Sequence, residues 1–361
     1  MAVVLLSGCQ LALPQSTLNP AGDVAQSQQD LFLFVFWIAV VIFIGVQGFL
    51  TIAVLKYRSR RGHESDVPPQ THGNTPLEIG WTIAPSLIVI AITIPTVAGI
   101  GATYDAPSQY ADDPSLTIEV VGHQWWWEYR YLDENGDLDF ITANELHIPV
   151  DTVINLKLSS NDVIHSFSVP RLAGSRDVVP GRVNRMWLNA TETGVYAGQC
   201  KEFCGDSHAL MRTVAFARES ADYEAWAENE RQPAVDRTAA MDAGWVVFQE
   251  NACRGCHTIE GATEDEYELA IGVTGPNLSH FGSRVTIAAN TLHKGPADMN
   301  MGAFFEDVPT DPDFMQRDPA AENLKRWLNN APDVKPGTEM PDLDLTDQQL
   351  DDLVFFLESL K

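Results

Sequence analysis

The chain has 361 residues, which is enough for two or three domains. Its formal net charge of −26 excludes nucleic acid as a partner, because a phosphate backbone binds to a basic surface. The hydrophobic content of 45% fits soluble domains joined to a few membrane spans. An acidic surface would attract a basic protein partner, although the solubility of an exported domain accounts for the charge equally well.

Residues 2–9 form a short apolar region that ends in small residues before Cys9. This pattern resembles a bacterial lipoprotein signal, which would leave Cys9 as the lipidated first residue of the mature chain. A positive charge before the apolar region is missing, so a fortuitous match stays open. Residues 10–29 show no periodicity and predict a polar tether, so residues 1–29 are interpreted as a signal segment and its tether.

Two apolar runs, Leu31–Leu55 and Ile79–Ile100, are each long enough to cross a bilayer as one helix. Pro85 and Pro95 in the second run are tolerated in a membrane, where neighbouring helices satisfy the freed backbone groups. Basic residues directly after the first run keep that end cytoplasmic, namely Lys56, Arg58, Arg60 and Arg61. Residues 30–102 therefore predict a hairpin in a bacterial plasma membrane, with the N-terminus and the rest of the chain on the outer face.

Residues 103–220 change to short alternating runs such as Val153–Leu158, with a strong hairpin turn at Glu134–Asp137. Several such strands at even spacing predict an antiparallel β-sandwich or barrel. Three consecutive tryptophans, residues 125–127, lie in this region. Neighbouring side chains on a strand point to opposite faces, so at least one of the three should be exposed or at an interface.

A short loop between residues 199 and 211 places two thiols, an imidazole and a thioether at the spacing Cys-x3-Cys-x3-His-x2-Met. Soft sulfur ligands combined with imidazole suit copper, and a weak axial methionine can tune its potential. Zinc accepts thiolates and histidine but rarely a thioether. His165 is the candidate for a second imidazole. The alternative interpretation is a disulfide between Cys200 and Cys204, with Met211 in the core and His208 at the surface.

The loop resembles the dinuclear copper loop of subunit II of haem–copper cytochrome c oxidases. The resemblance implies a cupredoxin-like Greek-key fold and two copper ions held by bridging thiolates, two imidazoles, a thioether and one backbone carbonyl. It assigns these roles to Cys200 and Cys204, His165 and His208, Met211, and the carbonyl of Glu202. The Glu202 side chain would also reach a magnesium ion at the boundary with the catalytic subunit.

The same resemblance implies roles for three further residues. Glu78, at the start of the second span, would lie at the mouth of a proton-uptake path; the simpler interpretation is a charged residue that snorkels to the membrane interface. Trp125 would belong to the surface patch where electrons enter from cytochrome c, although aromatic residues on strands most often fill a core. Asp162 would be an acidic docking residue beside that patch.

Residues 221–238 are charged, contain proline and predict a linker, whose first part could form a short helix. The motif Cys253-Arg254-Gly255-Cys256-His257 follows, and Cys-x-x-Cys-His is the covalent attachment motif of haem c, with the histidine as proximal ligand. A zinc site would need a second pair of ligands close by. Residues 239–361 resemble an all-α class I cytochrome c domain.

Two terminal helices of that domain should cross, with Gly244 permitting close approach and a capping box at Thr346 opening the last helix. Met340, in a Pro- and Gly-containing loop before this helix, is the predicted distal ligand. Met299, Met301 and Met315 are rivals. The carbonyl of Pro276 is expected to orient the proximal imidazole. The acidic segment 310–318 suggests no role.

The sequence thus predicts a chain of three modules, a membrane hairpin, a copper domain and a haem domain. It resembles subunit II of a cytochrome c oxidase with a fused cytochrome c. Electrons would pass from a cytochrome c or a quinol–cytochrome c reductase through haem c and copper to catalytic subunit I, which reduces oxygen. Two alternatives stay open, the corresponding subunit of a copper-containing nitric oxide reductase and a stand-alone membrane-tethered electron carrier.

Overall fold

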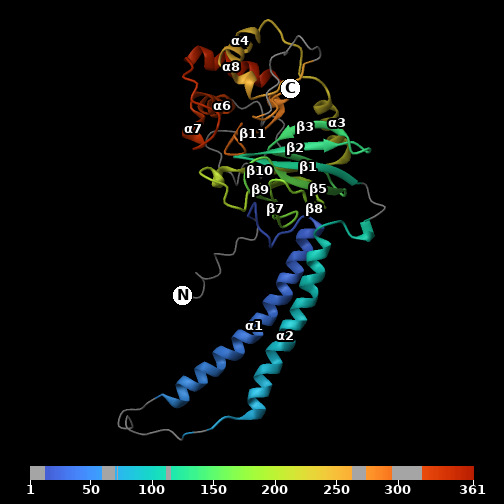
Figure 1. Cartoon of the computed structure of the whole chain (residues 1–361), viewed down its shortest axis with the longest axis vertical. Coiled ribbons are helices and arrows are strands. Elements are labelled where there is room, and N and C mark those ends of the chain that lie inside the picture. The colour runs from blue at the N-terminus through green and yellow to red at the C-terminus, as the bar shows by residue number, and fades with distance from the viewer. Residues whose placement is uncertain (1–12, 59–69, 71, 111–114, 262–273, 295–318) are drawn as a thin grey trace. The chain divides into compact units, whose positions relative to one another are not determined.

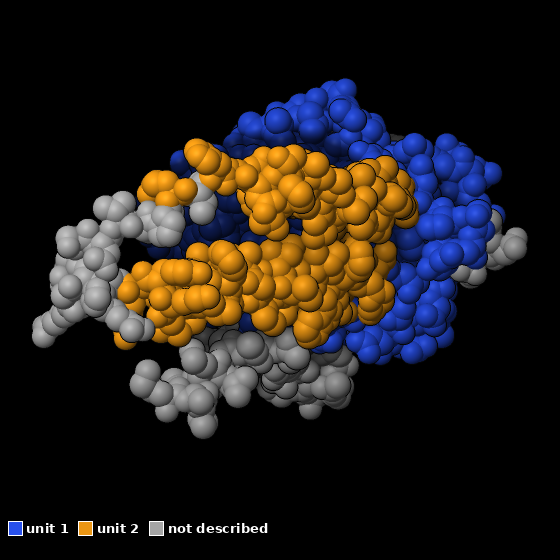
Figure 2. Space-filling model, turned by 90° about the horizontal axis from the view of Figure 1, so that it is seen from below, with its two compact units in different colours: residues 1–25, 104–361 blue, residues 26–103 orange. Residues whose placement is uncertain are grey.

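The computed structural model describes residues 13–58, 70, 72–110, 115–261, 274–294 and 319–361. Two compact units make up the chain, residues 26–103 and residues 1–25 together with 104–361 (Figure 2). Several predictions concern residues outside the described ranges. These are the lipid signal at Cys9, the basic residues Arg60 and Arg61, the acidic segment 310–318 and the rival ligands Met299, Met301 and Met315.

The unit of residues 26–103 contains two long apolar helices that run side by side (Figure 1). Helix α1 spans Asp23–Tyr57 and helix α2 spans Thr75–Ala102, with Pro85 and Pro95 inside α2. Asn74 caps α2 by accepting a hydrogen bond from the Leu77 backbone N–H at 3.3 Å. The apolar stretch of each helix is unburied in the chain. Helices of this length and composition fit a bilayer, so the predicted helical hairpin is confirmed.

Residues 13–25 pack against the β domain, which we define as residues 115–231. The Ala21 N–H donates to the Arg171 carbonyl at 2.7 Å, and the Asp23 N–H donates to Asn189 Oδ1 at 2.9 Å. Ala21 and Val24 are buried in the core of that domain. The segment predicted as a polar tether thus packs against the β domain over residues 13–25, and α1 begins eight residues before the apolar run that predicted it.

The β domain contains two main sheets and a separate ribbon (Figure 1). A five-stranded sheet has the order β3 (Leu138–Ala143), β2 (Trp126–Leu132), β1 (Ser115–His123), β5 (Val153–Ser160) and β8 (Asn184–Leu188). A three-stranded sheet has the order β4 (Glu145–Pro149), β10 (Arg212–Arg218) and β9 (Gly194–Gln199). The ribbon pairs β6 (His165–Ser168) with β7 (Ser175–Val178). Fully buried residues form the core, including Ile118, Leu146, Leu156 and Phe167.

The hairpin turn predicted at Glu134–Asp137 connects β2 to β3. Asp133 Oδ1 accepts hydrogen bonds from the backbone N–H groups of Asn135 at 2.9 Å and Asp137 at 2.8 Å. Gly136 has a φ of 84°, a left-handed conformation that glycine adopts without steric cost. The turn prediction is confirmed, and the predicted cupredoxin-like β domain is present. The expectation of a purely antiparallel arrangement is wrong, because β1 pairs with β5 and β4 pairs with β10 in parallel.

Helix α3 (Ser220–Arg231) closes the β domain. Tyr223 and Ala227 on this helix belong to the buried core, and Trp226 packs against it. The segment predicted as a linker is thus a packed helix in its first part, as the sequence allowed. Only the coil after Arg231 connects the β domain to the next one.

The C-terminal domain, residues 239–361, is built from α4 (Asp242–Glu250), α6 (Pro319–Asn329), α7 (Ala331–Val334) and α8 (Asp347–Ser359). Helices α4 and α8 pack together as predicted. The backbone of Gly244 on α4 approaches α8 so closely that a Cβ at this position would overlap the Asp352 carbonyl oxygen. The capping box between Thr346 and Gln349 is present. The helical domain is confirmed, with one addition, a short ladder between β11 (Thr286–Ile287) and β12 (Leu292–His293).

Candidate metal and haem sites

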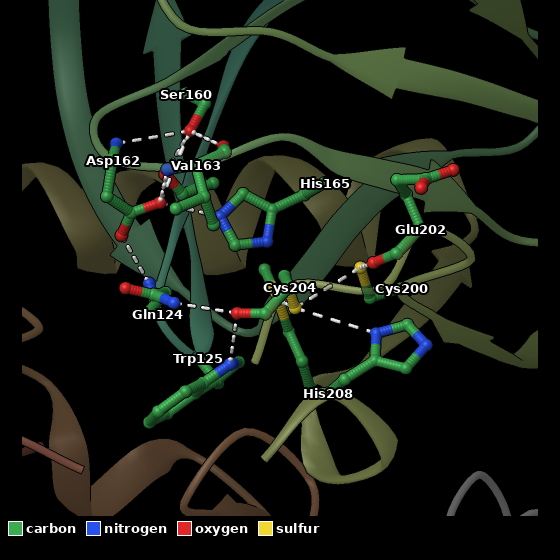
Figure 3. Close-up of polar contacts among 12 residues, drawn as sticks. Gln124, Trp125, Ser160, Asp162, Val163, His165, Cys200, Glu202, Cys204 and His208 are labelled. Atoms are coloured by element: carbon green, nitrogen blue, oxygen red, sulfur yellow. Dashed lines mark hydrogen bonds and ion pairs between the residues drawn. The ribbon is translucent and has the colours of Figure 1, made fainter. Parts of the chain in front are cut away.

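The loop between β9 and β10 gathers the predicted copper donors. Its two ends are tied together, because the Cys200 N–H donates to the Met211 carbonyl at 2.9 Å. The sulfur atoms of Cys200 and Cys204 lie 3.9 Å apart, and Cys204 Sγ lies 3.5 Å from His208 Nδ1 and 3.8 Å from Met211 Sδ. Cys200 Sγ lies 3.2 Å from the Glu202 carbonyl oxygen. Five of the six predicted donors therefore converge within one loop, and Figure 3 shows four of them, Cys200, Glu202, Cys204 and His208.

His165 brings the sixth donor from β6. Its ligating atoms and those of Cys200 and Cys204 all lie within 4.8 Å of one another, and all three residues are buried. The ring Nε2 hydrogen-bonds Asp162 Oδ1 at 2.7 Å, while Nδ1 is buried without a hydrogen-bond partner (Figure 3). A buried ring nitrogen is costly to leave unsatisfied. A metal ion bound at this nitrogen would satisfy it, so His165 fits the predicted copper site.

Two residues that hold the His165 ring were not recognised from the sequence. Asp162 accepts hydrogen bonds from the ring and from the Gln124 backbone N–H at 2.6 Å, and its expected role as a docking residue stays a prediction. Gly122 on β1 faces the same ring, and a Cβ there would lie 2.8 Å from His165 Cδ2. The three-residue spacing of Asp162 and His165 was a visible signal for the first contact. The approach of Gly122 depends on the pairing of distant strands and had no local signal.

The two thiols of the loop have opposite pKa shifts. The hydrogen bond from Cys204 lowers the pKa of Cys200 to about 3, and the same interaction raises the pKa of Cys204 well above that of a free thiol. Loss of the second proton would leave two negative sulfurs 3.9 Å apart. A soft metal cation bound by both sulfurs would remove this repulsion. Both cysteines are free thiols in the structure, which does not support the alternative disulfide.

Burial and hydrogen bonding act in opposite directions on His165. Burial lowers its pKa, but the hydrogen bond to Asp162 and the charge of the nearby Cys200 thiolate outweigh this effect and raise the pKa overall. The pKa of Asp162 moves the opposite way, because its hydrogen bonds to His165 and to backbone N–H groups outweigh the opposing effect of burial. The pair is thus polarised toward an anionic carboxylate that orients the imidazole, an arrangement common behind metal-ligating histidines.

A second site lies in the C-terminal domain, where Cys253, Cys256, His257 and Met340 line one cavity of about 280 Å³. A structural zinc site is closed by four ligands around a single ion, so an open cavity of this volume suits a larger group. His257 Nδ1 hydrogen-bonds the Pro276 carbonyl at 2.8 Å, which is the contact that was expected to orient the imidazole. This bond leaves Nε2 available to a ligand. Gly275 provides room for the ring, since a Cβ there would lie 2.6 Å from His257 Cε1.

Arg284 lines the same cavity and was missed by sequence reasoning. The guanidinium is buried; its Nη2 donates to the Asn277 carbonyl at 2.7 Å, while Nε has no hydrogen-bond partner. Burial lowers the pKa of Arg284, and the nearby carboxylates of Glu230 and Glu145 oppose this effect. A haem carries two carboxylates, which a buried guanidinium would bind well. The lining residues and the buried positive charge of the cavity therefore suit a haem, and no local pattern distinguishes Arg284 in the sequence.

Trp125 lies between the two sites. Its indole Nε1 donates to the Cys204 carbonyl at 3.0 Å, and its side chain also lines the cavity of the C-terminal domain. Only 6% of Trp125 is exposed, so it does not form an open surface patch in this chain, and its predicted role in electron entry stays a prediction. Trp125 is buried because the fused C-terminal domain covers it. Of the three tryptophans Trp126 is the least buried, as strand geometry requires, and it stacks on His123 with ring centroids 4.1 Å apart.

Glu202 and Glu78 are the remaining predicted site residues, and both have exposed side chains. Glu202 belongs to the copper loop next to Phe203, which is 76% exposed. Glu78 lies in the first turn of α2, where its backbone N–H donates to the Asn74 carbonyl at 3.0 Å. The binding of magnesium by Glu202 and the role of Glu78 in proton uptake stay predictions.

Family models match three parts of the chain. Residues 10–98 match the transmembrane domain of cytochrome c oxidase subunit II, residues 134–217 match its periplasmic domain, and residues 241–361 match cytochrome c. These matches follow the order of the helical hairpin, the β domain and the C-terminal domain.

Individual relatives agree with the family models. Cytochrome c oxidase subunit 2 of Alkalihalophilus pseudofirmus is 32% identical over 99% of this chain and 94% of its own length. The protein of the same name from Bacillus sp. strain PS3 is 32% identical over 100% of this chain and 95% of its own length. Quinol oxidase subunit 2 of Bacillus spizizenii is 35% identical over 65% of this chain and 72% of its own length. The chain therefore belongs to the family of cytochrome c oxidase subunit 2, with a C-terminal cytochrome c domain.

Proposed function

We propose that the chain is the subunit through which electrons enter an aerobic respiratory terminal oxidase. Electrons would pass from an external donor to haem c in the C-terminal domain, then to a dinuclear copper centre in the β domain, and finally to a catalytic subunit that reduces oxygen to water. The position of Trp125 is the observation that carries this proposal. One side chain lines the haem cavity and hydrogen-bonds the backbone of the copper loop.

The copper ligands in this proposal are His165, Cys200, Cys204, His208 and Met211, together with the Glu202 carbonyl. A dinuclear copper centre bound by these residues would accept and release one electron at a time. The chain contributes a rigid frame, because β6, β9 and β10 fix the ligands and Asp162 fixes the His165 ring. Ligands held by packed strands move little when the charge changes, which favours rapid electron transfer.

The residues that would hold the haem in this proposal are Cys253 and Cys256, whose thiols would form thioether bonds to it, and His257 and Met340, which would bind its iron. Haem c bound in the cavity would supply a second one-electron carrier. The Pro276 carbonyl holds the His257 ring by its Nδ1 and so presents Nε2 to the iron position. Arg284 offers the buried positive charge that a propionate requires.

The exposed side of the copper loop is proposed to face catalytic subunit I. Phe203 is largely exposed there, and its ring lies 5.8 Å from the ring of His208. Exposed aromatic residues beside a functional loop are typical of protein interfaces. Magnesium at Glu202 and proton uptake near Glu78 would belong to the same assembly. Neither α1 nor α2 contains a histidine, so the oxygen chemistry requires a different subunit with haem ligands in the membrane.

The chain is a membrane protein, and we propose that its metal domains lie on the outer face of the bacterial plasma membrane. The basic residues Lys56 and Arg58 at the end of α1 support this orientation. The donor would be a cytochrome c or a quinol–cytochrome c reductase. The net charge of −26 would steer a basic donor toward the outer domains.

Metal analysis and an optical spectrum of the purified chain test the proposal. We expect two copper ions for each covalently bound haem, and a chain that binds only zinc would overturn the assignment. The purified complex should consume oxygen. Consumption of nitric oxide instead would favour a nitric oxide reductase, and purification without a multi-span haem subunit would favour a stand-alone carrier.

A further inference from the structure

We propose that two buried charged side chains, Lys335 of the C-terminal domain and Glu145 of the β domain, lock the haem domain permanently over Trp125. An external donor would then deliver electrons to the haem alone and could not reach the copper domain directly. This inference rests on the proposed function, since it concerns the step from haem to copper.

Lys335 directly follows α7 and is 3% exposed. Its ammonium group donates to the Trp125 carbonyl of the β domain and, at 3.2 Å, to the Ala288 carbonyl of its own domain. Burial lowers the pKa of Lys335 to about 7. Fully buried lysines are rare because the ammonium loses its hydration. Two carbonyl groups, one from each domain, accept hydrogen bonds from the amine and reduce this cost, and they connect the domains at Trp125.

The residues after Lys335 continue this contact along the copper loop. Ser207 Oγ donates to the Pro336 carbonyl at 2.6 Å, and Ser207 is fully buried next to the proposed ligand His208. Gly337 has a φ of 80° and lies against the indole of Trp125, since a Cβ at Gly337 would lie 2.7 Å from Cη2. A larger residue would not fit in this conformation. The segment 335–337 is therefore shaped to cover Trp125.

Glu145 on β4 makes the reciprocal contact. Its Oε1 accepts hydrogen bonds from the backbone N–H groups of Val285 at 2.9 Å and Thr286 at 2.7 Å, and from Thr286 Oγ1 at 2.8 Å. The second oxygen lies 3.5 Å from His147 Nε2. Burial favours the protonated form of Glu145, but its hydrogen bonds to His147 and to Thr286 lower its pKa overall. A carboxylate of the β domain thus binds the backbone of β11 in the C-terminal domain.

These two contacts differ from those of a reversible electron-transfer complex. Reversible partners approach through exposed charges whose attraction is screened by salt. Lys335 and Glu145 are instead buried. Lys335 of the C-terminal domain binds a backbone carbonyl of the β domain, and Glu145 of the β domain binds backbone N–H groups of the C-terminal domain. Breaking either contact would leave a buried charge without its partner, which is strongly unfavourable. The haem domain should therefore stay bound, and Trp125 should stay covered.

The test uses the full chain in its oxidase complex, with copper and haem contents measured first. Lys335→Met keeps the aliphatic stem and removes the N–H donors, while Glu145→Gln weakens the reciprocal contact from the other domain. Lys325→Met is the matched control, because Lys325 is a partly exposed lysine of the same domain. One readout is the rate of electron transfer from haem to copper after flash photoreduction. The second is hydroxyl-radical labelling of Trp125, which reports whether the domain still covers it.

For Lys335→Met we expect a rate lower by roughly tenfold or more, because small misplacements of reacting groups have large effects on rate. Both optical spectra should be retained, and labelling of Trp125 should rise. Glu145→Gln should change both readouts in the same direction by a few-fold, and Lys325→Met should change neither. In the unmutated complex the rate should not depend on salt.

Two results separate the inference from the proposed function. If copper and haem are both bound and neither variant changes the electron-transfer rate or the labelling of Trp125, the locked interface is overturned. The proposed function is not affected by that result. If the unmutated complex binds both copper and haem but transfers no electron from haem to copper, the proposed function is overturned. If Lys335→Met fails to bind haem, Glu145→Gln decides the matter, because its substitution lies outside the haem domain.

Discussion

The carboxylate of Asp162 holds the imidazole of His165 by a 2.7 Å hydrogen bond to Nε2, and this leaves the buried Nδ1 as the free ring nitrogen. The contact determines which nitrogen can bind a metal. Asp162 also accepts from the Gln124 backbone N–H, next to Trp125. One carboxylate therefore fixes both a proposed copper ligand and the backbone beside the proposed path for electrons.

Replacing Asp162 with alanine should weaken copper binding while haem binding is retained. Loss of the outer contact of a metal-ligating histidine typically lowers metal affinity by about 10-fold to 100-fold. Competition with a copper chelator would measure the change, with the haem absorbance as an internal reference. Asp137→Ala is the control, because Asp137 is exposed in the β2–β3 turn. Equal copper affinity in both variants would show that Asp162 does not orient His165.

Substitutions in the two proposed centres should have separable effects. Cys200→Ser removes one bridging thiolate and should abolish the mixed-valence copper spectrum, while the haem c spectrum is retained. Met340→Ala removes the distal ligand and should alter the haem spectrum while the copper signal is retained. Optical and electron paramagnetic resonance spectra measure both. Loss of both signals in either variant, without unfolding, would contradict the division into two modules.

The donor sets could be predicted from the sequence because their residues are close together in the chain. Cys200 to Met211 form one loop, and Cys253 to His257 form one motif, so spacing alone indicated the chemistry. His165 was found because its partners lacked a second imidazole. Arg284 was not found, since its position in the cavity results from contacts between segments that are distant in the sequence.

The burial of Trp125 could not be predicted for a related reason. The pattern of a strand gives the face on which a side chain lies, but it does not show which domain packs on that face. Lys335 and Glu145 look like ordinary charged residues in the sequence. Their burial follows only from the docking of the two domains, which no short-range pattern encodes.

Gly244→Ala should destabilise the C-terminal domain. A Cβ at this position would overlap the Asp352 carbonyl oxygen and crowd Phe356 on α8, so the two helices would have to separate. Overpacking of this kind typically costs about 1–3 kcal/mol. Thermal unfolding followed by the haem absorbance would measure the loss. Val246→Ala, on the exposed face of α4, should have little effect, and similar losses in both variants would contradict the predicted close crossing.

Glu230 should make the stability of the chain depend on pH. Burial raises its pKa from 4.5 to about 7, and the nearby Arg284 only partly offsets this effect. Between these two values the folded state binds more protons than the unfolded state. Stability contributed by the protonated carboxyl is therefore lost as the pH rises through this window. Between about pH 5 and pH 8 the loss should amount to roughly 2–3 kcal/mol.

Glu230→Gln should remove this dependence, because an amide carries no charge at any of these pH values. Denaturant unfolding at several pH values would measure the difference in unfolding free energy between the variant and the unmutated chain. That difference should be small near about pH 5 and should grow in favour of the variant toward about pH 8. Glu228→Gln is the control on the same helix, since the Glu228 side chain is 66% exposed. A flat difference for Glu230→Gln, or one that grows toward acid pH, would mean that Glu230 is charged in the folded chain and that Arg284 neutralises it.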